Sequence, residues 1–113
     1  MTAMTTYINL TPHMLNVYTN MGTCLNIPPS GDVARVSTVD TVLTDLGGAV
    51  GLVSTSYGDV TGLPTDVSVD QYYIVSGMVA SAISGRNDVV SPGALVRDDS
   101  GKPVGCNGLR SSL

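Results

Sequence analysis

The 113-residue sequence contains no phenylalanine, tryptophan or glutamate, and its only lysine is Lys102. Charged residues make up 12% of the chain, about half of the ~25% that is typical of soluble domains, whereas hydrophobic residues make up 42%. Disordered chains show the opposite balance, low hydrophobicity with high charge, so we expect this chain to fold. A chain of this length is long enough to bury a core, and we expect a single domain over residues 1–113.

Positive charge is scarce. Five basic residues stand against nine aspartates, which gives a net charge of −4. General binding to nucleic acid depends on many phosphate contacts, so this balance excludes it. No apolar run approaches the ~20 residues of a membrane span, and the first residues lack the basic and apolar regions of a secretory signal. We therefore expect a cytoplasmic protein that does not bind membranes.

Cysteine and histidine are also rare, with Cys24, Cys106 and His13 as their only members. A structural zinc site needs four ligands, so no metal site is predicted. We expect two separate buried thiols, since cytosolic thiols usually stay reduced; the alternative is a disulfide that closes a long loop. The sequence has no phosphate-binding glycine loop and no nucleophile elbow, so we predict no cofactor and no catalytic residues. An enzyme that uses His13 is the least supported class of function.

Valine and threonine, which favour strands, are abundant, and glycine and proline divide the chain into short pieces. This rhythm is typical of a mainly β fold, and we predict a small antiparallel barrel or sandwich. Residues 38–46 are compatible with either strand or helix. Turns are expected at Gly47-Gly48, at Tyr57-Gly58 and at Ser91–Gly93. The expected strands are Met14–Tyr18, Thr23–Ile27, Val33–Val36, Ala49–Thr55, Tyr72–Val75, Leu95–Arg97 and Lys102–Cys106.

One segment differs from the rest. Residues 76–84 place Met78, Val79, Ala82 and Ile83 on one helical stripe. The sequence therefore predicts one helix near residues 76–84, with Gly85 as its C-cap.

Arginine is the most informative residue type in a chain so poor in charge. Arg35 lies within an apolar strand, while Arg86 and Arg97 stand close to aspartates. A guanidinium group offers fixed, bidentate recognition of phosphate or carboxylate, so these three are candidate anion-binding residues. The alternative is that Arg86 with Asp88, and Arg97 with a following aspartate, form internal ion pairs that hold turns.

Two further side chains complete the candidate site. His13 follows a proline that fixes the backbone and could direct the imidazole towards a ligand. Tyr57 precedes a glycine at the expected end of a strand, where its ring could stack on a base. The alternative for His13 is a turn residue with its ring bonded to a nearby carbonyl. The predicted ligand-binding residues are His13, Arg35, Tyr57, Arg86, Asp88 and Arg97.

Several short motifs occur together over residues 7–109. They are NLTPH (Asn9–His13), IPPSG (Ile27–Gly31), VARVS (Val33–Ser37), YG (Tyr57-Gly58), GLP (Gly62–Pro64), YIVS (Tyr73–Ser76), RND (Arg86–Asp88), SPG (Ser91–Gly93), VRD (Val96–Asp98) and GC (Gly105-Cys106). The pattern resembles a family of small proteins encoded by bacteriophages and by actinobacterial genomes and mobile elements. The resemblance implies a single-domain accessory protein of phage type, located in the cytoplasm of a bacterial host, and it implies no reaction.

Two functions from different classes follow. The first is a non-catalytic module that binds a small anionic, nucleotide-like ligand and sequesters a host signal. The second is a structural component, either a virion or capsid-decorating protein or another protein-interaction subunit. Charge depletion is typical of interface cores, so we also expect a symmetric homo-oligomer.

Overall fold

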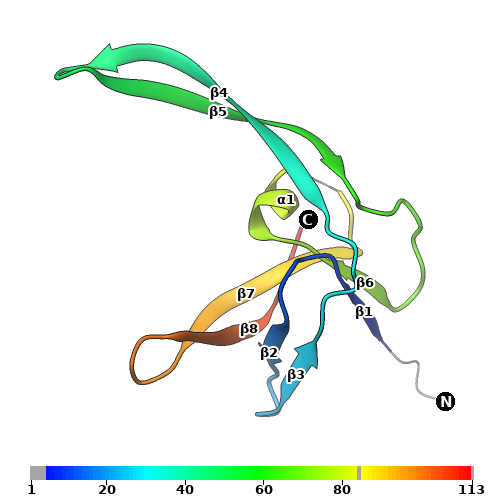
Figure 1. Ribbon diagram of the computed structural model, residues 1–113. Helices are drawn as coiled ribbons and strands as arrows, with labels where there is room; N and C mark the ends of the chain where they lie inside the picture. Colours follow the sequence, from blue (N-terminus) through cyan, green and yellow to red (C-terminus); the bar gives the residue numbers. More distant parts are fainter. Residues whose placement is uncertain (1–4, 84, 113) are drawn as a thin grey trace.

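Figure 1 shows a computed structural model of the chain, which describes residues 5–83 and 85–112. A six-stranded sheet has the order β1-β6-β7-β8-β2-β3, and β4 and β5 form a separate two-stranded sheet. The prediction of a mainly β domain with one short helix is confirmed. In chain order the elements are β1 (Thr6–Asn9), β2 (Leu15–Tyr18), β3 (Cys24–Ile27), β4 (Arg35–Leu46), β5 (Val50–Thr61), β6 (Gln71–Ile74), α1 (Gly77–Ser81), β7 (Val89–Arg97) and β8 (Pro103–Ser111).

The six-stranded sheet and α1 form what we call the body. Antiparallel pairing joins β2 to β3 and β7 to β8, the strands that are connected by hairpins. Three other pairs, β1 with β6, β6 with β7 and β8 with β2, are parallel. Parallel strands need a crossover connection, so each of these pairs joins segments that the sequence pattern alone does not link.

The body sheet curves into a nearly closed barrel. The two end strands of this sheet, β1 and β3, are joined by a side-chain hydrogen bond. The Asn9 amide nitrogen in β1 donates to the carbonyl of Ile27 in β3 at 2.9 Å. The backbone N–H of Ser30 donates to the Asn9 carbonyl at 2.9 Å. Asn9 is fully buried, and these bonds give it the partners that a buried amide requires.

The core lies between β6 and α1. Strand β6 is paired on both edges, and Tyr73, Ile74 and Val75 at its end are buried. The Ser76 hydroxyl caps α1 by accepting from the N–H of Val79, which is itself buried. The main cluster of buried core residues comprises Leu10, Ala34, Tyr73, Val75, Val79 and Val89.

The helix occupies the predicted place, but its end differs. The C-cap is Ala82, whereas Gly85 follows three residues later with φ +79. The expected C-cap at Gly85 was therefore wrong, and the predicted end at Ser84 lies outside the described residues.

The turns expected at Ser91–Gly93 and at Tyr57-Gly58 are absent, and each of these segments is part of a continuous strand. Strand β7 runs through Pro92 and Gly93, where a Cβ at position 93 would collide with the carbonyl oxygen of Asn107. Strand β5 continues past Tyr57-Gly58, where a Cβ at Gly58 would collide with the Ser37 hydroxyl. Both glycines permit close approach of strands rather than turns.

The β4–β5 hairpin, Arg35–Thr61, forms what we call the arm. Each of its strands has 12 residues, and Figure 1 shows it extending from the body into solvent. The molecule consequently measures 63 × 40 × 25 Å. Its radius of gyration is 17.2 Å, against about 13 Å for a compact domain of this length.

Candidate functional site

The six predicted ligand-binding residues lie in different parts of the molecule. Three of them line separate hollows: His13 faces one beside β2, Arg35 one beside α1, and Asp88 one beside β6. Tyr57 stands on the arm and Arg97 ends β7. The structure therefore brings together only Arg86 and Asp88 as a direct pair.

Arg86 and Asp88 form a bidentate ion pair. The Arg86 Nε and Nη2 atoms donate to the two Asp88 carboxylate oxygens at 2.9 and 2.6 Å, and Nη1 donates to the Pro64 carbonyl at 2.9 Å. The guanidinium also lies 6.0 Å from the centre of the Tyr73 ring. The hydrogen bond from Arg86 lowers the pKa of Asp88, whose side chain is buried. This pair matches the structural alternative, since it ties three segments of the body together.

Arg97 holds the turn between β7 and β8. Its Nη1 atom donates to the Gly101 carbonyl at 2.8 Å. Asp98 supports the same turn, accepting at 2.9 Å from the backbone N–H of both Ser100 and Lys102. The Ser100 hydroxyl also donates to the Asp98 carboxylate, at 2.6 Å, and this side-chain bond is the main cause of the lowered pKa of Asp98.

The NLTPH motif has a structural role. The carboxamide oxygen of Asn9 accepts from both the N–H and the hydroxyl of Thr11, at 2.9 and 2.6 Å. Its nitrogen donates to the His13 carbonyl at 2.8 Å. The turn is thus fixed through the backbone of His13, whose side chain is exposed.

Arg35 and Tyr57 both belong to the arm. Arg35 is exposed at the start of β4 and makes no ion pair with any residue in the described part of the chain. It lines a hollow with Leu10 and Val79. Tyr57 is 51% exposed and pairs with Thr38 across the hairpin.

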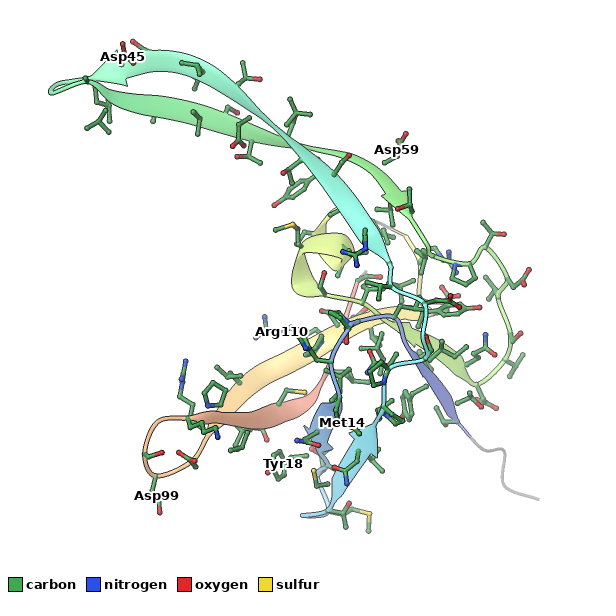
Figure 2. All side chains as sticks on the ribbon, viewed as in Figure 1. Met14, Tyr18, Asp45, Asp59, Asp99 and Arg110 are labelled. Atoms are coloured by element: carbon green, nitrogen blue, oxygen red, sulfur yellow. The ribbon has the colours of Figure 1, made fainter. Side chains whose placement is uncertain are left out.

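Sequence reasoning missed an extended exposed apolar surface, which is the arm itself. Figure 2 shows its side chains standing off both faces of the hairpin, with Asp45 near its far end. Beyond Val36 and Val60 at its base, every arm residue is exposed. The signal was present in the sequence: valine, leucine and threonine dominate residues 36–60, and the only charges there are aspartates. The exposed large side chains are Val39, Val42, Leu43, Leu46, Val50, Leu52, Val53 and Tyr57.

The register divides these residues between two faces. Val42 pairs with Val53 and Thr38 with Tyr57, which places them on one face. An irregularity between Val42 and Thr44 shifts the alternation of β4. Beyond it, Thr44 pairs with Leu52 and Leu46 with Val50, so the opposite face becomes apolar at the arm tip, residues 46–52.

The second missed surface is an apolar hollow on the body, which we call the body groove. It has a volume of about 470 Å³. Met14 and Leu95 in its wall are 53% and 56% exposed. Its lining consists of His13, Met14, Leu15, Asn16, Pro92, Leu95, Pro103, Val104, Gly105 and Cys106.

Cysteine positions differ from expectation. Cys106 is buried as predicted, whereas Cys24 is exposed on β3, the last strand of the body sheet. Both thiols are free. The expectation of burial was wrong for Cys24 because β3 is an end strand of the body sheet and leaves most of its side chains in solvent.

Across residues 5–83 and 85–112, no group of three or more histidine, cysteine or aspartate side chains is arranged to hold a metal ion. The helix described there, α1, has only five residues and is too short to span a bilayer. Comparison with protein-family models, with curated proteins and with solved structures finds no match to this chain.

Proposed function

We propose that this protein is a structural subunit that assembles with other protein chains through its arm. The observation that supports this proposal is the exposure of the arm, which carries apolar side chains on both faces. An isolated two-stranded hairpin is at best marginally stable in water. A partner that covers the arm would supply the burial that the chain itself does not.

The exposed area of the chain agrees with this proposal. The chain exposes 7623 Å², whereas a compact monomer of 11.6 kDa exposes about 5,800 Å². The excess of about 1,800 Å² is comparable with two standard protein interfaces of about 800 Å² a side.

The backbone of the arm supports the same function. Both outer edges of the hairpin carry unpaired N–H and C=O groups along 12-residue strands. Exposed edges are usually protected by lysine, proline or short length. Here residues 50–58 contain no charged residue and no proline, which favours an edge that meets a partner.

The resemblance to phage-encoded proteins suggests which assembly the subunit belongs to. A small, β-rich, weakly charged subunit with an extended arm suits a virion or capsid-decorating component. We therefore propose the virion as its location in the assembled state, and the host cytoplasm as the location before assembly.

The direct test compares two valines of similar exposure. Val50 at the arm tip is 56% exposed, and Val67 in the loop before β6 is 68% exposed. A charge at an interface core must be desolvated, so Val50→Lys should weaken self-association by about tenfold or more. Light scattering and sedimentation across a concentration series measure the effect.

Val67→Lys is the matched control and should associate like the natural chain. The proposed function is wrong if the natural chain is monomeric at every concentration and is absent from assembled particles. It is also wrong if the two variants associate equally well. Circular dichroism of each variant checks that the body remains folded.

The anionic-ligand function stays a prediction. Arg86 is engaged by Asp88 and Arg97 by Gly101, so Arg35 is the predicted arginine best placed to meet a ligand. A thermal-shift screen with nucleotides tests this function, because a ligand that binds only the folded state raises the melting temperature.

A further inference from the structure

The body groove is shaped to receive side chains rather than a strand. Pro92 and Pro103 in its wall have no backbone N–H, so they cannot donate to an added strand at those positions. A cavity of ~150 Å³ holds a benzene molecule, so a space of about 470 Å³ can hold several aliphatic side chains. The exposed Met14 and Leu95 make the groove an apolar acceptor.

The arm tip has the matching chemistry. Leu46, Val50 and Leu52 lie on one face of it and are 49%, 56% and 41% exposed. Because these side chains are exposed, the tip does not fill the groove of its own chain. The turn between Leu46 and Val50 consists of Gly47, Gly48 and Ala49. Because these residues carry at most a methyl group, the aliphatic side chains on either side project beyond the turn.

Charge favours the same pairing. Asp40 and Asp45 are the only charged residues between positions 36 and 58. The charges next to the groove are Lys102, which precedes Pro103 in its wall, and Arg97, two residues beyond Leu95. Asp98 and Asp99 lie further along the same turn, and Asp98 is bonded to backbone N–H groups of that turn. Complementary charge at the rim of an apolar contact guides orientation and speeds association.

From these observations we infer that the arm tip of one copy docks in the body groove of a second copy of this chain. The inference rests on the proposed assembly function and names its acceptor. Donor and acceptor are different surfaces of one chain, so each copy offers one of each. Such a heterologous contact closes into a ring when the rotation between copies permits, and otherwise extends as a filament.

A cysteine pair tests the contact directly. Two chains with Cys24→Ser are co-expressed with tags of different size, one carrying Val50→Cys and the other Met14→Cys. Both chains also carry Cys106→Ala, because Cys106 lies in the wall of the groove and would otherwise compete for the thiol introduced at position 50. Under mild oxidation we expect a mixed disulfide dimer, identified on a non-reducing gel by its intermediate size. Replacing Met14→Cys by Val67→Cys is the control and should remove the mixed dimer.

Two outcomes would overturn the inference. One is a predominant dimer between two Val50→Cys chains, which would show arms pairing with each other. The other is the absence of a mixed dimer, or a mixed dimer that forms equally well with Val67→Cys.

Groove variants separate this inference from the proposed function. Leu95→Lys and Met14→Lys should each weaken self-association by about tenfold or more, as Val50→Lys does. If Val50→Lys disperses the assembly and both groove variants, folded by circular dichroism, assemble normally, the groove is not the acceptor and the arm function stands. If none of the three changes assembly, both are wrong.

Discussion

Valine occurs in both the body and the arm, but valines in the core of the body are buried and those on the arm are exposed. Val75 and Val79 in the body are 0% and 1% exposed, whereas Val42 on the arm is 69% exposed. Valine is frequent in both regions, although threonine is concentrated in the arm, and both regions form strands. The difference is that β6 has a strand on each edge and α1 near its end. Within the described residues β4 and β5 pair only with each other, and only the base of the arm, at Val36 and Val60, packs against the core.

This contrast separates strand propensity from burial, two properties that composition alone does not distinguish. A branched side chain favours an extended backbone wherever it stands. Burial requires a second layer, and in this chain only the body supplies one. The arm therefore has the composition of a core strand and the surroundings of an interface.

The largest expected effect lies in the body. Asp88→Ala leaves Arg86 partly buried without its counter-ion, and we expect it to lower the free energy of unfolding by about 3 kcal/mol. Chemical denaturation measures the loss. Asp99→Ala removes an exposed carboxylate from the β7–β8 turn, and as the control it should change stability by less than about 0.5 kcal/mol.

Acid provides a second measurement on the same pair. Arg86 lowers the pKa of Asp88 in the folded state, so the pair contributes its full stability above the unfolded pKa of about 3.9. That contribution is lost as the pH falls from there through the lowered folded pKa. We expect Asp88→Asn to reduce this acid-dependent loss. An unchanged acid profile would contradict the role of the pair.

A smaller effect compares the two regions directly. Val79→Ala should cost about 2 kcal/mol, because it removes buried methyl groups and leaves a cavity. Val42→Ala should cost less than about 0.5 kcal/mol, because Val42 is exposed in the isolated chain. Both are measured in the Val50→Lys background, which we expect to be monomeric. Equal costs would mean that the arm is packed against the body in solution.

Much of the body could be predicted from local patterns. The helix follows from the stripe of Val79, Ala82 and Ile83, and the strands of the β2–β3 hairpin follow from alternation. The parallel pairings could not be predicted, because they join segments that no hairpin connects, from 16 residues apart for Tyr73 with Val89 to 89 for Val17 with Cys106. The extension of β7 through Pro92-Gly93 depends on a close contact with Asn107 that no local pattern reveals.

The candidate site was harder to predict than the fold. The sequence indicates that Arg86 and Asp88 could pair, and the structure shows the pair, but proximity in sequence did not show that Pro64 and Tyr73 would complete it. The arm was missed because alternation predicts a strand without telling which strands remain uncovered. Residues 38–46 were ambiguous for the same reason, since they are exposed and no described element covers either face.

The irregular register of the arm has a consequence for solubility. Long, flat hairpins with uncharged edges stack into fibrils when identical faces repeat without interruption. Here two register shifts, one near Val36 and one near Val42, interrupt the alternation and increase the local twist. The apolar residues consequently move from one face to the other along the hairpin. Such a surface can bind a partner of complementary shape, and it resists the repeated stacking of identical hairpins that would convert free subunits into amyloid.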